Sequence, residues 1–112
     1  MITILSFSFK NQAPYGYNII DCRAIKNNPH SNPEYHGLDA SDIGLREYVL
    51  KDPRAKSLLQ DALQAYIKGA ERIAFGCSYG QHRSVVMARE FKRMLDVPAV
   101  LQHRDLIGVN YE

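Results

Sequence analysis

Apolar and polar positions along the chain follow two periods, one typical of buried strands and the other typical of amphipathic helices. Short runs of β-branched, aliphatic and aromatic residues predict four strands, at residues 2–9, 17–22, 72–76 and 99–102. Apolar residues spaced three or four positions apart predict helices at residues 43–50, 54–68 and 83–95. Because strands alternate with helices, we expect a three-layer α/β fold with a small, mostly parallel sheet of about four strands.

Polar residues mark the ends of the predicted helices. Asp39 or Ser41 can cap the helix at residues 43–50, because a side-chain oxygen at that point accepts a hydrogen bond from the first turn. Asp52 and the proline after it end this helix and begin the next one, and Gly69 suits a C-cap. The link between the first two strands is short for a parallel crossover, so the sequence leaves their pairing open.

Residues 26–38 interrupt the alternation of strands and helices. This segment contains two prolines, three asparagines, two histidines and a glycine, so we expect no regular structure in it. A loop of this length in a small domain is often functional, and the alternative is a mobile connector. The sequence leaves both interpretations open.

Length, charge and cysteine content narrow the class of protein. A chain of 112 residues predicts a single domain covering residues 1–112. The net charge of +2 does not indicate a nucleic-acid-binding protein, and two cysteines do not make a disulfide framework. The first residues have no basic start, so we do not expect a signal peptide. No apolar run approaches the length of a membrane span, and we expect a cytoplasmic protein without membrane contact.

The stretch at residues 72–84 carries the strongest chemical signal. It reads RIAFGCSYGQHRS, which predicts a strand, a tight polar loop and the start of a helix. In this arrangement the N–H groups of the loop and of the first helical turn face one point, where the helix dipole favours an anion such as phosphate. Arg83 can add a bidentate donor to the same oxygens. We therefore expect a phosphate-binding loop between the third strand and the helix that follows it.

Two further polar clusters follow predicted strands, and ligands bind parallel sheets beyond the carboxyl ends of their strands. Asp21 and Arg23 follow the second strand, where they either form a surface ion pair or orient the amine of a sugar. His103 and Arg104 follow the last strand, where they suit either the phosphate end of a ligand or an oligomer contact. The histidines and cysteines (His30, His36, Cys22 and Cys77) do not have the spacing of zinc ligands, so we expect no metal and no cofactor.

The loop fits the pattern C-x-x-G-x-x-R-S, which resembles the signature of the protein tyrosine phosphatases. That resemblance implies that Cys77 attacks phosphorus, that Arg83 holds the phosphoryl oxygens and that Ser84 assists the leaving thiolate. The alternative is an inert cysteine buried at the end of a strand. The sequence departs from the phosphatases at Gly76, where they have histidine. The candidate general acids are Asp39, Asp42 and Asp105, none of which lies in an acid-loop motif.

A second resemblance covers nearly the whole chain. The segments SFSFK, IIDCR with NPH, GLD, VLKDP, FGCSYGQHRSV and QHRDL are similar, in order and spacing, to the C-terminal domain of the RNase adaptor protein RapZ. This resemblance implies a non-catalytic sensor domain that binds glucosamine 6-phosphate. It also implies a homodimer or larger homo-oligomer and, in full-length members of the family, contact with small regulatory RNA and RNase E.

The matching residues define the ligand site that the resemblance implies. The expected ligand-binding residues are Asp21, Arg23, His30, Ser78, Tyr79, Gly80, Gln81, His82, Arg83, His103 and Arg104. Tyr79 stands where the family has glycine, which fills the mouth of the loop and can change the ligand. The sequence contains no counterpart of the family's N-terminal nucleotide-binding domain or of its basic tail, since it ends in IGVNYE. We therefore do not expect RNA or an RNase to bind in the same way.

These observations support three hypotheses for the function. The first is a binding domain for a phosphorylated sugar or a related phosphorylated metabolite, in which loop residues hold the phosphate. The second is a small phosphatase that uses Cys77, Arg83 and Ser84. The third is a regulatory adaptor for RNA or protein, which only the likeness to RapZ supports.

Overall fold

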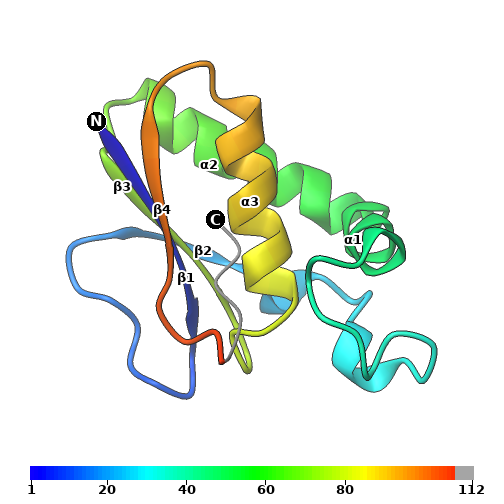
Figure 1. The fold of residues 1–112 in the computed structure, drawn as a ribbon. Helices are drawn as coiled ribbons and strands as arrows, with labels where there is room; N and C mark the ends of the chain where they lie inside the picture. The colour runs from blue at the N-terminus through cyan, green and yellow to red at the C-terminus, as the bar shows by residue number, and fades with distance from the viewer. Residues whose placement is uncertain (108–112) are drawn as a thin grey trace.

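The structure, a computed structural model, describes residues 1–107 and contains a four-stranded parallel sheet (Figure 1). The central strands are β1 (Ile2–Ser8) and β3 (Arg72–Cys77), and the edge strands are β2 (Asn18–Asp21) and β4 (Ala99–His103), in the order β2-β3-β1-β4. The α/β fold with a small parallel sheet is confirmed. The first two strands, whose pairing the sequence leaves open, are not neighbours, because β2 pairs with β3.

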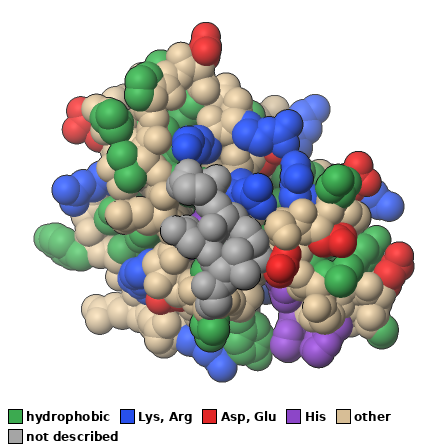
Figure 2. Space-filling model, in the orientation of Figure 1, with side chains coloured by type: hydrophobic (Ala, Val, Ile, Leu, Met, Phe, Trp, Pro, Cys, Tyr) green, Lys and Arg blue, Asp and Glu red, His purple; other side chains and the backbone are tan. Residues whose placement is uncertain are grey.

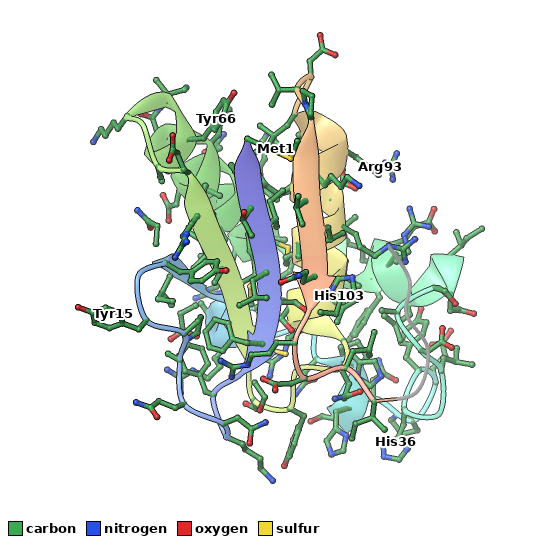
Figure 3. All side chains as sticks on the ribbon, turned by 60° about the vertical axis from the view of Figure 1, so that its left-hand side comes forward. Met1, Tyr15, His36, Tyr66, Arg93 and His103 are labelled. Atoms are coloured by element: carbon green, nitrogen blue, oxygen red, sulfur yellow. The ribbon has the colours of Figure 1, made fainter. Side chains whose placement is uncertain are left out.

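Two α-helices, α2 (Pro53–Ile67) and α3 (Arg83–Met94), pack on one face of the sheet and lie behind it in Figure 3. The helix α1 (Ile43–Leu50) packs on these two helices and lies to the side of the sheet. The main core lies between the helices and the sheet and includes Phe75 of β3 and Phe91 of α3, whose ring centroids are 5.6 Å apart. Within residues 1–107, no helix has both the length and the apolar character needed to cross a bilayer.

The opposite face of the sheet is covered by the loop at residues 9–17. Phe9 and Tyr17 of this loop pack on Leu5, Phe7 and Ala74, which are buried and do not belong to the main core. An extended segment gains about 3.3–3.6 Å per residue, so a short loop is long enough to run from the end of β1 to the start of β2 without a helix. In the described part of the chain, this loop and not a second set of helices covers that face of the sheet.

The structure corrects the expected cap of α1 and supports that of α2. Asp42, and not Asp39 or Ser41, is the N-cap of α1, because its carboxylate accepts a hydrogen bond of 2.9 Å from the Leu45 N–H. The Asp39 carboxylate instead accepts from the Ser41 N–H, in a turn that precedes the helix. Asp52 caps α2 as expected, with a proline in the first turn.

The segment at residues 26–38 is more ordered than its composition suggests. It contains a turn of 3-10 helix, η2 (Pro29–Ser31), where we expected no regular structure. The Asn28 side chain begins this turn by accepting from the His30 N–H at 3.2 Å. The buried Asp52 carboxylate fixes the start of the segment by accepting from the N–H groups of Lys26 and Asn27. A second 3-10 turn, η1 (Cys22–Ala24), follows β2.

Candidate functional site

A cavity of about 430 Å³ lies at the carboxyl ends of the central strands β1 and β3. A volume of this size is typical of small-molecule sites. Four segments far apart in the sequence contribute to it: the end of β1, the η2 region, the β3–α3 loop and the exit from β4. The lining residues are Ser8, Lys10, Asn11, Asn28, His30, Cys77, Tyr79, Gln81, His82, Arg83, Asp105 and Ile107.

The loop between β3 and α3 is held in place by one glycine and one glutamine. Gly80 has φ +73°, and a Cβ atom there would lie 3.1 Å from the Ser8 backbone nitrogen and 3.2 Å from the Asp105 Cβ. Only glycine combines this conformation with so close an approach at little cost. The Gln81 side chain donates to the carbonyls of Tyr79 and Asp105, at 3.0 and 2.8 Å. The loop is therefore braced against the exit from β4.

The backbone of this loop has N–H groups that no other group of the described chain uses. Within residues 1–107, the N–H groups from Tyr79 to Arg83 donate no hydrogen bond to another protein group. The next N–H, that of Ser84, lies 3.4 Å from the Cys77 sulfur. Backbone N–H groups are obligatory donors, so consecutive unused donors beside a cavity need water or a ligand as acceptor.

Arg83 is the first residue of α3, and the residue is only 6% exposed. Its guanidinium donates to the carbonyl of Ile25 at 2.9 Å and, at 3.5 Å, to the carbonyl of Arg23 and to the hydroxyl of Ser78. All of these acceptors are uncharged. Within residues 1–107, Arg83 forms no salt bridge with a carboxylate, although it lines the cavity. A buried cation without an ionic partner is costly, and an anionic ligand would compensate it.

Cys77 ends β3 and reaches the cavity wall from a buried position, since the residue is 3% exposed. Its Sγ lies 3.1 Å from the Ser84 Oγ. The preceding residue has to be glycine, because a Cβ at Gly76 would lie 2.3 Å from the Phe7 ring. The histidine that the tyrosine phosphatases have at this point does not fit here.

Asp105 is the only carboxylic acid that lines the cavity in residues 1–107. Its carboxylate accepts from the Ser8 N–H at 2.7 Å and pairs with Arg104 at 2.9 Å. Burial alone would raise the pKa of Asp105, but the hydrogen bonds from Arg104 and from the Ser8 N–H outweigh it and hold the pKa below its ordinary value. Asp105 is therefore an ionised structural group at neutral pH.

Aromatic and basic side chains form the mouth of the cavity. The Tyr79 ring is 4.9 Å from the His30 ring, and the Lys10 ammonium lies 4.5 Å from the Tyr79 ring centroid. His30 also lies 5.1 Å from His36, and histidines gather at the lower edge of the molecule in Figure 2. In the described part of the chain, no three histidine, cysteine or acidic side chains come together in an arrangement that could hold a metal ion.

His82 connects the loop to the segment before α1. Its Nε2 donates to the Leu38 carbonyl at 2.9 Å. Burial lowers the pKa of His82 below its ordinary value. The hydrogen bond to the Leu38 carbonyl raises this pKa, but the neighbouring His30 and His36 lower it further, so the net shift is downward. The imidazole is therefore largely neutral at pH 7.

Part of the residue set expected from the sequence lies at the cavity. Tyr79, Gln81, His82, Arg83 and His30 line it. The Ser78 hydroxyl lies 3.5 Å from the Arg83 guanidinium, and Gly80 packs behind the loop.

The other expected residues are occupied by contacts within the chain and are not part of the cavity wall. Asp21 and Arg23 form a bidentate ion pair with distances of 2.9 and 2.8 Å. His103, labelled on β4 in Figure 3, shares a hydrogen bond of 2.7 Å with the Ser6 hydroxyl. Arg104 donates to the carbonyls of Asn11 and Gln12, so it fastens the β1–β2 loop to the exit from β4.

Sequence reasoning missed the contribution of β1. Ser8, Lys10 and Asn11 lie in the cavity wall because β1 is a central strand, adjacent to both β3 and β4. The polar residues directly after the first apolar run were a signal for this position. Asn28 and Ile107 were also missed as lining residues, and only the tertiary arrangement brings them to the site.

Comparisons with known proteins identify the family of this chain. A relative from Ruegeria pomeroyi, called a nucleotide-binding protein, is 35% identical over 105 residues, which cover 84% of this chain and 37% of the relative. Proteins of the same description from Thermobifida fusca and Clostridium botulinum are 33% and 36% identical and cover 92% and 94% of the chain. The chain spans about two fifths of the length of these relatives. The RapZ C-terminal domain matches residues 1–107, so the chain belongs to the RapZ C-terminal domain family.

Proposed function

We propose that this domain binds a phosphorylated small molecule and holds its phosphate between the β3–α3 loop, the first turn of α3 and Arg83. The observation that carries the proposal is the buried Arg83 guanidinium, which lines the cavity and forms no ion pair within residues 1–107. The unused N–H groups from Tyr79 to Arg83 add donors of the kind that bind phosphate oxygens.

The relatives and the resemblance suggest two classes of phosphorylated ligand. The relatives are called nucleotide-binding proteins, and this chain corresponds to only part of their length. The resemblance to RapZ implies glucosamine 6-phosphate, a sugar with one phosphate. Both classes present the same tetrahedral anion to Arg83, so the proposal covers both.

Binding without reaction fits the site better than phosphatase chemistry. A phosphatase needs a carboxylic acid to protonate the leaving group, and the pKa of such an acid has to lie near the working pH. Asp105 lines the cavity, but its lowered pKa and its bonds to Arg104 and Ser8 leave it without a proton to give. Asp42 is occupied as the cap of α1. Asp39, the third candidate acid, is outside the cavity wall.

Isothermal titration calorimetry with inorganic phosphate and with glucosamine 6-phosphate tests the proposal. We expect Arg83→Met to weaken binding of both by about 100-fold, the loss that removing two charge-assisted hydrogen bonds produces. Arg93→Met is the matched control, because Arg93 is exposed on the same helix and pairs with Glu90 away from the cavity. Equal affinity of the wild type and Arg83→Met would overturn the phosphate site.

The phosphatase remains the second candidate, because the Cys77 sulfur and the Ser84 hydroxyl are 3.1 Å apart at the cavity wall. Hydrolysis of p-nitrophenyl phosphate measures it directly. Turnover that disappears in Cys77→Ser would establish the enzyme. No turnover, together with a melting temperature that rises with a phosphorylated ligand, would support the binding domain.

The adaptor role, the homodimer and contact with RNA or an RNase stay predictions of the family resemblance. The prediction about the basic tail concerns the end of the given sequence, which lies outside the described residues. Light scattering measures the oligomeric state, and a gel shift at moderate salt measures RNA binding. Weak binding that is equal for unrelated RNAs would count against an RNA adaptor.

A further inference from the structure

The two ends of the cavity differ in chemistry. The inner end has Arg83 and the unused N–H groups, which suit a phosphate. The outer end has Tyr79, a residue that is 44% exposed, and the His30 ring, which lies 4.9 Å from the Tyr79 ring. A ligand that fills both ends has an anionic group at one end and contacts aromatic faces at the other.

The side chains of Ser8 and Gln81, between these ends, have partners within the chain. The Ser8 hydroxyl donates to the Ser78 carbonyl, and both polar ends of the Gln81 amide are used, by the carbonyls of Tyr79 and Asp105 and by the Ile107 N–H. A hydroxyl-rich sugar would have to compete for these groups. A flat ring makes no such demand, because it needs only the face of an aromatic side chain.

Asn28 and His82 are occupied in the same way. The Asn28 side chain accepts from the His30 N–H at 3.2 Å, and the His82 Nε2 donates to the Leu38 carbonyl at 2.9 Å. The Tyr79 ring also has neighbours, His30 and Lys10, but the Lys10 contact involves an exposed side chain and is easier for a ligand to replace than these hydrogen bonds.

Tyr79 is held where a ligand ring can meet it. The loop backbone cannot swing easily, because Gly80 is packed against Ser8 and Asp105 and the Tyr79 carbonyl accepts from Gln81. The Lys10 ammonium, 4.5 Å from the Tyr79 ring centroid, belongs to an exposed and flexible side chain. A ligand ring can therefore displace Lys10 from the ring face at small cost.

We propose that the phosphorylated ligand of this cavity has a flat aromatic ring, as in a nucleoside monophosphate, and that Tyr79 selects it by stacking. The inference rests on the proposed function, because the phosphate is taken to bind at Arg83. Among ligands that carry the same phosphate, Tyr79 therefore favours those whose opposite end is an aromatic ring.

Calorimetric titration of adenosine 5′-monophosphate, glucosamine 6-phosphate and inorganic phosphate into three proteins tests the inference. The proteins are the wild type, Tyr79→Phe, which keeps the aromatic face, and Tyr79→Leu, which keeps apolar bulk without it. We expect the wild type to bind adenosine 5′-monophosphate about tenfold more tightly than the other two ligands, as stacking of one base on an aromatic side chain produces. Tyr79→Phe should retain this preference and Tyr79→Leu should lose it, with the affinity for inorganic phosphate unchanged in both.

The outcomes separate this inference from the phosphate site. Equal binding of all three ligands by the wild type, or a preference that survives in Tyr79→Leu, would overturn the role of Tyr79 and leave the phosphate site intact. Tighter binding of glucosamine 6-phosphate than of the nucleotide would overturn the aromatic class of ligand. Failure of all three to bind would overturn both proposals.

Discussion

Arg83, at the end of the β3–α3 loop, and Arg104, after β4, lie near the same edge of the sheet, but they differ in what neutralises them. Arg104 pairs with Asp105 at 2.9 Å and donates to two backbone carbonyls of the β1–β2 loop. Within residues 1–107, the Arg83 side chain donates hydrogen bonds only to carbonyls and a hydroxyl. Arg23, after β2, resembles Arg104, because it pairs with Asp21 at 2.8 Å.

This difference indicates that the charges of Arg104 and Arg23 support the structure, whereas the charge of Arg83 is suited to bind a ligand. A side chain whose charge is compensated within the chain has little to gain from a second anion, whereas an uncompensated buried cation gains much. The residue type is the same at all three positions, so the function of each arginine depends on its neighbours. The predictions below test this assignment, from the largest expected effect to the smallest.

Gly80→Ala should have the largest effect, because Gly80 lies where the β3–α3 loop meets Ser8 and Asp105. An alanine at φ +73° costs about 1–2 kcal/mol, and crowding of its Cβ at 3.1 Å adds to this, so we expect a loss of about 2–3 kcal/mol in the free energy of unfolding. Urea unfolding measures it. Gly37→Ala is the control, since a Cβ there would meet no atom within 4 Å. Equal losses of unfolding free energy in the two variants would contradict the special role of Gly80 in the loop.

Arg104→Met should destabilise the protein by about 1–2 kcal/mol, because it removes charge-assisted hydrogen bonds to the β1–β2 loop and leaves the Asp105 carboxylate without its cation. Phosphate affinity should change by less than about threefold, the scale of a weak charge effect at an exposed site. Urea unfolding and calorimetry measure the two quantities. A large loss of phosphate affinity in Arg104→Met would place this arginine at the ligand.

The pH dependence of stability should show the ion pair of Asp105. Its folded-state pKa lies below the ordinary value of 3.8, so its contribution is present above pH 3.8 and is lost as the pH falls through the folded-state pKa. As the pH falls through this range, the free energy of unfolding should therefore decrease less in Asp105→Asn than in the wild type. Unfolding in urea at a series of pH values measures the difference, and parallel curves for the two proteins would contradict it.

Arg23→Met should have the smallest effect. The side chains of Arg23 and Asp21 are 49% and 46% exposed, and exposed pairs contribute little because water and salt screen them. We expect the urea midpoint and the phosphate affinity to stay near the wild-type values. A marked loss of glucosamine 6-phosphate binding in this variant, with phosphate binding unchanged, would instead support a role of Asp21 and Arg23 at the sugar.

The sequence by itself determined the elements and the loop. Apolar periodicity located every strand and α-helix to within about two residues, the usual uncertainty of element ends. The pattern G-C-S-Y-G-Q-H-R-S identified the β3–α3 loop and Arg83, because strand, turn and helix signals are local and lie within a few residues of one another. Local signals also identified the cap at Asp52, although they chose the wrong residue for α1, where several aspartates compete.

Only the tertiary structure decided which polar residues share the cavity. The strand order β2-β3-β1-β4 places β1 beside β3, so Lys10 and Asn11 lie at the site. Asp21 ends the edge strand β2, Arg23 follows it in η1, and the two side chains form an ion pair with each other. Pairing of charges depends on distances of a few ångströms between residues far apart in the chain, and such distances exist only after the sheet has formed. The sequence predicted three polar clusters at one edge, and the fold left the one around Arg83 without a salt bridge in the described residues.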